Sequence, residues 1–352
     1  MSIKVKGIVV EILKERERNI LLYIIEEYIN QAEPVSSRSI AKKMTHRWGS
    51  ATIRNVMLDL EKMGFLYKPH PVSGRVPTNK AFRYYIDRLN YSEFPRKKEV
   101  LALKGMLKPC YHYIEEVMVD ASRTLAAISR YTSIVVEPKI DTMLFKEIEF
   151  VKMSKNNILV VFVTSAGTVH TRYVDAGEPL DMDFLMSMKL YLNKRFEGIP
   201  FYALKSEIEK DLENDKTRFN IILSKIKDSI ETILEAKDKR EIYIDGTSKI
   251  MGFPEFADIE SLRELFKALE KKEKLLRLLD KCLKEEGINV ILGIESDIKE
   301  MRNVSIITST YKITDKSFGI LGVIGPVRMD YSRIIPIVNY TAKTVSDIIR
   351  TM

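Results

Sequence analysis

Residues 50–75 read SATIRNVMLDLEKMGFLYKPHPVSGR, and this stretch decides the fold of the N-terminal part of the chain. Ser50 is a residue type that caps helices, and Gly64 stands where a left-handed glycine ends one. A short extended run, a turn rich in proline, serine and glycine, and a second extended run from Arg75 follow. A helix followed by such a hairpin is typical of a winged helix-turn-helix, in which the recognition helix and the wing contact DNA.

Three more helices are expected around this stretch. Over 15–29 the apolar residues recur with the spacing of one buried helical face. Ser36 and Ser37 form a cap for a second helix over about 38–45. The prolines of the hairpin forbid helix until about 79–89, where a helical pattern returns. The order helix, helix, helix, hairpin, helix is that of a winged-helix domain.

The helix that begins at Ser50 should bury one face and expose the other. Its apolar residues at helical spacing are Ile53, Met57 and Leu60. The outer face then holds Thr52, Arg54, Asn55 and Asp59. In a helix-turn-helix the N-terminal end of this helix enters the major groove, so its outward side chains are candidates for base contacts.

The residue types at these positions suit DNA. Hydroxyls and a helix N-terminus bind phosphate oxygens, while arginine reads guanine and asparagine reads adenine. The basic tip of the hairpin suits phosphate or minor-groove contact. The predicted DNA-binding residues are Ser36, Arg38, Ser50, Thr52, Arg54, Asn55, Lys68, His70 and Arg75. The alternative is a solvated surface helix beside a hairpin whose prolines block edge pairing.

Charge is concentrated in the same region. Residues 1–90 contain 16 lysines and arginines against 9 acidic residues, so they carry +7 of the net charge of +8. The remainder of the 352-residue chain is therefore almost neutral. A polyanion such as double-stranded DNA is expected to bind at the N-terminal end.

Beyond a polar linker at about 90–98 the sequence predicts an α+β fold. A helical stretch over 100–130, broken at Pro109, is followed by a first group of strands. A long, charged helical block then separates this first group of strands from a second group. The strand Asn157–Thr164 is expected to be buried on both faces. The expected strands are Ser133–Glu137, Phe145–Lys152, Asn157–Thr164, Thr168–Tyr173, Glu241–Asp245, Asn289–Gly293, Val304–Thr310 and Ser317–Ile324, and the last helix is Val338–Ile349.

Several classes of function find no support in the sequence. Cys110 and Cys282 are far apart, and the four histidines form no spaced ligand set, so we expect neither a metal nor a disulfide framework. No nucleophile elbow or phosphate loop occurs, so we expect no enzyme and no cofactor. The longest apolar runs fall far short of a membrane span, and a cytoplasmic protein is expected.

Several motifs at both ends of the chain resemble the HrcA family, the heat-inducible transcription repressors of bacterial chaperone operons. The matching motifs are EEYI at 26–29, EPVSSR at 33–38, ATIRN at 51–55, LEKMG at 60–64, SGRVPT at 73–78, FRYYID at 82–87 and GVIGPVRMDY at 322–331. The resemblance covers nearly the whole chain.

The resemblance implies three domains. These are a winged-helix DNA-binding domain over 1–95, a GAF-like α/β domain over 96–176 and 263–352, and an inserted, mostly helical dimerisation domain over 177–262. It also implies a homodimer that represses chaperone operons at an inverted repeat, the CIRCE element. Heat inactivates repressors of this family, and the GroEL chaperonin helps to restore them.

Two other functions remain as alternatives. The first is a winged-helix regulator that a small molecule switches by binding in its GAF-like domain. The second is an enzyme or adaptor that uses the winged helix for protein contacts. Operator binding without added ligand would favour the repressor, and a ligand that changes DNA affinity at fixed temperature would favour the first alternative.

Overall fold

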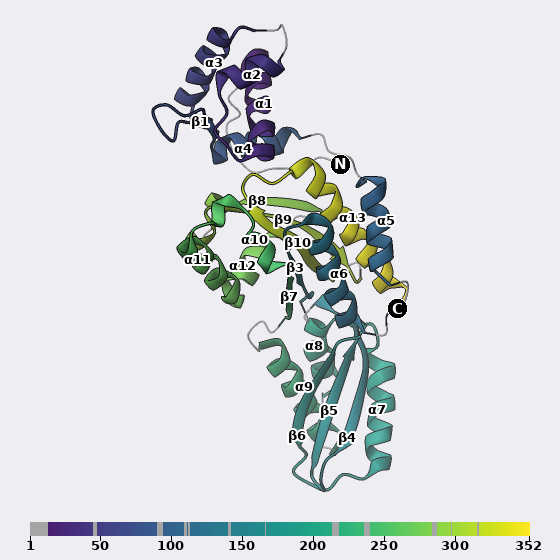
Figure 1. The fold of residues 1–352 in the computed structure, drawn as a ribbon. Helices are drawn as coiled ribbons and strands as arrows, with labels where there is room; N and C mark the ends of the chain where they lie inside the picture. The colour runs from purple at the N-terminus through teal and green to yellow at the C-terminus, as the bar shows by residue number, and fades with distance from the viewer. Residues whose placement is uncertain are drawn as a thin grey trace.

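The computed structural model has three parts that follow one another along the long axis of the molecule (Figure 1). A small helical part with a hairpin lies at one end, a five-stranded sheet between helices lies in the middle, and a three-stranded sheet with helices lies at the other end. The described residues are 13–44, 48–89, 94–108, 111, 113–139, 142–165, 167–212, 218–235, 240–283, 287–296, 298–314 and 317–352. None of the helices described in these ranges is both long and apolar enough to cross a bilayer.

The N-terminal part has the predicted order of elements. These are α1 (Glu15–Gln31), α2 (Ser37–Lys43), α3 (Ser50–Lys62), β1 (Leu66–Tyr67), β2 (Val76–Pro77) and α4 (Asn79–Arg88), with β1 and β2 paired antiparallel. Ile53, Met57 and Leu60 are buried as the helical spacing predicts. The predicted end of the second helix at Thr45 lies outside the described residues.

The two ends of α3 differ in how well the sequence predicted them. Gly64 has a φ of +76°, so it does end the helix in the left-handed conformation. The predicted serine cap is wrong, because the N-cap residue is Gly49 and Ser50 is the first helical residue. Gly49 has no side chain to cap the helix, so the extended backbone at Gly49 sets this boundary.

The central domain is built on an antiparallel sheet of order β7-β3-β10-β9-β8. Its strands are β3 (Thr132–Val136), β7 (Ile242–Asp245), β8 (Ile288–Leu292), β9 (Val304–Lys312) and β10 (Phe318–Pro326). One face is covered by α5 (Lys97–Met106), α6 (Ile114–Ser129) and α13 (Tyr331–Arg350), and the other by α10 (Thr247–Ile250), α11 (Ile259–Glu270) and α12 (Lys272–Leu283) (Figure 1). Short 3-10 turns are η2 (Pro254–Phe256), η3 (Gly293–Glu295) and η4 (Lys299–Met301).

Strand β10 is buried on both faces of this sheet. Leu321 and Val323 pack with α6 and α13, whereas Ile320 and Ile324 pack with α11 and α12. A Cβ at Gly322 would lie 2.2 Å from the carbonyl oxygen of Ile307, so the neighbouring strand needs glycine there. Strand β10, which the sequence predicts at Ser317–Ile324, is thus buried on both faces and packs closely against the neighbouring backbone.

The last helix begins earlier than expected. It starts at Tyr331 and contains Pro336, although the sequence favoured a start at Val338. Ile334 and Ile337 are fully buried against the sheet, and this burial offsets the backbone hydrogen bond that the proline cannot donate.

A separate unit lies between β3 and β7. It contains β4 (Phe145–Lys152), β5 (Asn157–Thr164) and β6 (Val169–Asp175) in one antiparallel sheet, followed by α7 (Met182–Phe196), α8 (Phe201–Asp211) and α9 (Arg218–Glu235). The buried side chains of these elements form a hydrophobic core of their own. We call residues 142–235 the inserted unit.

This packing differs from the insertion of 177–262 that the resemblance implied. The strands of 145–175 belong with the helices that follow them, because those helices cover the apolar face of the sheet. Residues 242–283 instead return to the central domain, where β7 pairs with β3 and α11 and α12 cover the sheet. The unit is also mixed α/β, since three of its elements are strands.

The prediction that β5 is buried on both faces is wrong. Ile158, Val160 and Phe162 are buried beneath the helices, while Leu159, Val161 and Val163 are partly exposed. Helices cover only one face of this sheet (Figure 1). The apolar alternation alone could not tell whether a second layer covers the other face.

Candidate nucleic-acid interface

Helix α3 presents the predicted base-reading side chains to solvent. Arg54 and Asn55 are exposed, while Ile53, Val56 and Met57 beside them are buried against α1 and α2. Thr52 is half-buried. The helical spacing alone therefore located the outward face of this helix correctly.

The start of α2 lies close to the start of α3. Ser36 caps α2, since its Oγ accepts a hydrogen bond from the amide of Ser39 at 3.1 Å. Arg38 is exposed in the first turn of α2. The hydroxyls of Ser50 and Ser37 are 3.5 Å apart, so the two helix N-termini lie side by side. Two adjacent helix N-termini with hydroxyl and guanidinium groups suit phosphate oxygens.

One lysine of this region is engaged within the protein. Lys43, in the last turn of α2, forms an ion pair of 2.8 Å with Glu27 of α1. The hydrogen bond with Glu27 raises the pKa of Lys43, so the lysine keeps its charge. This pair ties α2 to α1 and makes Lys43 a structural residue of the domain.

The wing carries two predicted contacts at its exposed tip. Lys68 and His70 are both exposed. The Lys68 ammonium donates to the carbonyl of Pro71, and the amide of His70 donates to Ser73 Oγ at 3.1 Å. The tip is thus an ordered turn with a basic side chain on one arm.

The side chain of Arg75 is largely buried, although the sequence predicted a contact with DNA for it. Its side chain is only 13% exposed, and its Nε donates to Glu61 of α3 at 2.8 Å. Its backbone forms two hydrogen bonds with Val35, of 2.9 and 2.8 Å. Arg75 therefore joins the wing to the recognition helix, and its contact with DNA stays a prediction.

Sequence reasoning also missed residues that hold the wing in place. A Cβ at Gly74 would lie 2.4 Å from the carbonyl oxygen of Val35, so only glycine allows this approach. Thr78 caps α4 and also donates to the carbonyl of Gly64 at 2.7 Å. The capping threonine of α4 can be recognised in the sequence. The contacts with Val35 and Gly64 are made only in the folded domain.

Both parts of the chain match models of one family. Residues 12–90 match the description "Winged helix-turn-helix transcription repressor, HrcA DNA-binding", and residues 115–335 match "HrcA protein C terminal domain". The chain belongs to the HrcA family. HrcA is a family of transcription repressors and not of enzymes, and this chain carries its winged-helix DNA-binding domain.

Curated HrcA relatives are similar over almost their whole length. The chain is 40% identical over 334 residues to the heat-inducible transcription repressor HrcA of Geobacter sulfurreducens, covering 95% of this chain and 97% of the relative. It is 34% identical to that of Syntrophobacter fumaroxidans, covering 96% and 97%. A solved structure titled as a hypothetical protein shares the fold, with a TM-score of 0.61 and 20% identity over 96% of this chain and 99% of that one.

Proposed function

We propose that this HrcA-family chain represses chaperone operons by binding a CIRCE-type inverted repeat as a homodimer, and that heat inactivates it. The observation that carries the proposal is the exposed pair Arg54 and Asn55 on α3, beside a wing that is fixed to the same helix. The relatives named heat-inducible transcription repressors support the regulatory role. Such a protein acts in the cytoplasm, where its operators are.

The operator test uses the recognition helix. Arg54→Ala and Asn55→Ala should each weaken operator binding by about 1–3 kcal/mol per lost base contact, because a bidentate contact discriminates between bases by that amount. Gel shifts with a CIRCE-type repeat and a scrambled duplex measure the effect. Arg123→Ala, at an exposed position on α6, is the matched control and should change neither affinity. Equal losses on both duplexes would make Arg54 and Asn55 phosphate contacts, and a wild type without preference would refute the repressor proposal.

The inserted unit is the proposed site of dimerisation. On α7, Met182, Met186 and Leu190 recur at helical spacing and are 56%, 54% and 63% exposed. An apolar stripe of this kind suits a two-fold contact with its copy, and two-fold protein symmetry matches an inverted repeat. This contact would fix the distance between the two recognition helices.

A charge in this stripe should separate the subunits. Leu190→Glu should convert the dimer to monomer in sedimentation and weaken binding to the full repeat more than to a half-site, since only the dimer holds both half-sites together. Met251→Glu is the control, because Met251 is equally exposed but lies in the central domain. Tyr173 on β6 is 75% exposed and lies opposite Leu159, on the face of the three-stranded sheet that the helices do not cover. If Leu190→Glu remains dimeric while Tyr173→Glu dissociates, this face of the sheet is the interface instead.

The heat switch is proposed to be loss of native packing in the central, GAF-like domain. Strands such as β10 are apolar on both faces, and such strands aggregate when exposed. A GroEL-type chaperonin would then restore the repressor by refolding that domain. Operator binding and tertiary structure should therefore disappear together on warming.

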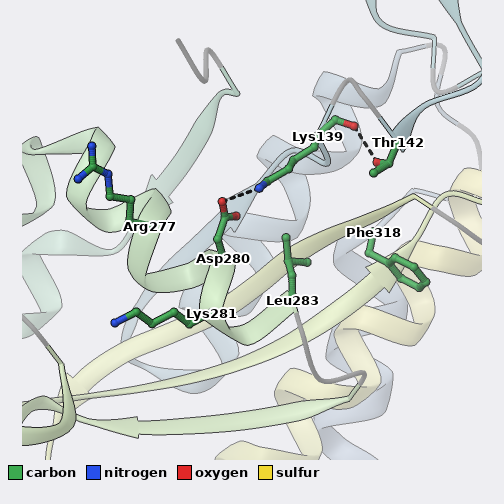
Figure 2. A pocket seen from close by; sticks show the side chains of 7 residues that line it. All are labelled: Lys139, Thr142, Arg277, Asp280, Lys281, Leu283 and Phe318. Atoms are coloured by element: carbon green, nitrogen blue, oxygen red, sulfur yellow. Dashed lines mark hydrogen bonds and ion pairs between the residues drawn. The ribbon is translucent and has the colours of Figure 1, made fainter. Parts of the chain in front are cut away.

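A small-molecule switch is the second candidate, because a pocket lies in the central domain beside the start of the inserted unit. It is lined by Lys139, Thr142, Arg277, Asp280, Lys281, Leu283 and Phe318 (Figure 2). Asp280 is paired with Lys139 at 2.9 Å and with Arg240 at 2.8 Å, and the Arg277 side chain points away from Phe318. The charges of Lys139 and Asp280 are therefore already paired within the protein, and a ligand that changes DNA affinity at fixed temperature would favour this candidate.

A further inference from the structure

The inserted unit is joined to the central domain by two connections, and one carboxylate binds both of them. The chain leaves the central domain after β3 and returns before β7; we call residues 137–139 the outgoing connection and residues 240–241 the returning connection. Asp280 of α12 pairs through Oδ2 with Lys139 at 2.9 Å and accepts through Oδ1 from Arg240 at 2.8 Å. We propose that Asp280 is a positioning residue for operator recognition, because it fixes the orientation of the inserted unit on the central domain. This inference rests on the proposed dimerisation through the inserted unit.

Asp280 lies on a helix that is packed on the central sheet. Leu276 and Leu279 of α12 are buried and belong to one hydrophobic core with Ile320 and Ile324 of β10. The Asp280 side chain is 24% exposed, at the rim of this core, and Figure 2 shows its pair with Lys139. Water screens only part of the attraction at such a site. The carboxylate is therefore a fixed anchor for the two cations.

The returning connection depends on this carboxylate more than the outgoing one. The Arg240 side chain is only 5% exposed, whereas that of Lys139 is 41% exposed. A guanidinium keeps its charge at any physiological pH, so a buried one that loses a carboxylate partner is destabilised. Lys139 can turn its ammonium to water instead. Without the Asp280 charge, we expect the returning connection to move outward so that Arg240 can be hydrated.

The two connections are also bound to each other. The Glu137 carboxylate accepts from the Tyr243 hydroxyl at 2.8 Å and from the amide of Glu241 at 3.1 Å. The amide of Glu137 donates to the carbonyl of Glu241 at 3.2 Å. The connections therefore move as one body, and Asp280 attaches that body to α12.

The orientation that Asp280 fixes has a consequence for DNA. The inserted unit has a core of its own, so its orientation relative to the central domain is set where the two connections meet that domain. In the proposed dimer, the two-fold axis doubles any rotation at the connections and changes the distance between the two recognition helices. Each winged helix stays docked on its own central domain. Asp280 thus acts on the spacing of the half-sites and not on the reading of bases.

The test measures the affinity of the full-length chain for inverted repeats with spacers of different length, and for a single half-site. The wild type should prefer one spacer length. Asp280→Asn should bind the preferred repeat about tenfold more weakly and discriminate less among spacers, because a looser link lowers the effective concentration of the second half-site. Its half-site affinity should be unchanged. Lys139→Gln releases only the outgoing connection, so it should show the same pattern with a smaller loss.

Glu300→Gln is the matched control. The Glu300 side chain is 25% exposed and pairs at 3.1 Å with Lys271, in the same domain as Asp280 but outside both connections. This variant loses an ion pair of similar exposure and should keep the wild-type spacer profile. If Glu300→Gln and Asp280→Asn changed the profile equally, a general loss of stability would explain both, and the inference would be wrong.

Small-angle X-ray scattering of the same proteins without DNA measures the orientation itself. Asp280→Asn should broaden the distribution of interatomic distances, and Glu300→Gln should match the wild type. Near-UV circular dichroism verifies that each variant is folded at the assay temperature; if Asp280→Asn is not, Lys139→Gln decides.

Two results would overturn the inference: unchanged scattering with an unchanged spacer profile, or equal losses on the full repeat and the half-site. A wild type that prefers no repeat would refute operator recognition instead. The scattering comparison would still decide whether Asp280 fixes the inserted unit, so the two failures can be told apart.

Discussion

Replacing Tyr331 by alanine should lower the free energy of unfolding by about 3–5 kcal/mol, the cost of removing a large aromatic side chain from a core. Tyr331 is fully buried at the start of α13, and its hydroxyl donates to the carbonyl of Val327 at 2.6 Å. Its ring lies 6.4 Å from that of Phe82, which belongs to α4 of the winged helix. Burial raises the pKa of Tyr331, so the hydroxyl stays protonated across the physiological range.

The consequence should reach DNA binding, because one hydrophobic core includes both the winged helix and the central domain. A heating curve that records near-UV circular dichroism and operator binding on the same sample measures both effects. For Tyr331→Ala the two transitions should move to lower temperature together. Tyr331→Phe keeps the ring and loses one hydrogen bond, so it should cost only about 1 kcal/mol.

A separation of the two curves would contradict this coupling. If operator binding disappears far below the structural transition in both wild type and Tyr331→Ala, the folding switch fails. A bound small molecule would then become the better explanation of regulation.

Removing Arg83 should cost about 2–3 kcal/mol of stability, because a buried ion pair that loses one partner leaves the other charge uncompensated. Arg83 of α4 is 8% exposed, and its Nε donates to Glu295 at 2.8 Å. Its Nη2 also donates to the carbonyl of Val290 at 2.9 Å, at the edge strand β8. The side chain of Glu295 is 35% exposed, so water reduces the free-energy cost of leaving its charge without a partner.

A double-mutant cycle separates this pair from general packing. Arg83→Ala, Glu295→Ala and the double variant should show a coupling energy well above zero in urea unfolding. Arg302→Ala, at an exposed position after η4, is the control and should be nearly neutral. Strict additivity of the two single losses would show that Arg83 acts through packing alone.

The contacts of Arg83 and Arg328 also explain how the winged helix is oriented. Arg328 pairs with Glu255 of η2, and its Nη1 donates to the carbonyl of Ile29 at 3.1 Å, in the last turn of α1. The DNA-binding domain is therefore docked on the central sheet by two arginines and a shared core. In the proposed dimer, loosening the central domain should release both recognition helices from their fixed spacing.

The sequence by itself determined the elements of the winged helix and the direction of its recognition face. The left-handed glycine at the end of α3, the prolines of the wing and the 3.6-residue spacing of Ile53, Met57 and Leu60 are local signals. Such signals act over a few residues, so they can be read without knowing what lies nearby in space. Arg54 and Asn55 were located in this way.

Only the tertiary structure decided which elements belong together and what each basic side chain touches. The strands of 145–175 were expected in the GAF-like domain, but strand patterns do not specify a partner sheet. The strands form a sheet of their own, which the helices α7–α9 cover. Arg75 pairs with Glu61, fourteen positions away, and Arg83 pairs with Glu295, on the far side of the inserted unit. These contacts depend on chain segments that meet only when the cores form, because burial and ion pairing are set by distance in space and not by distance along the chain.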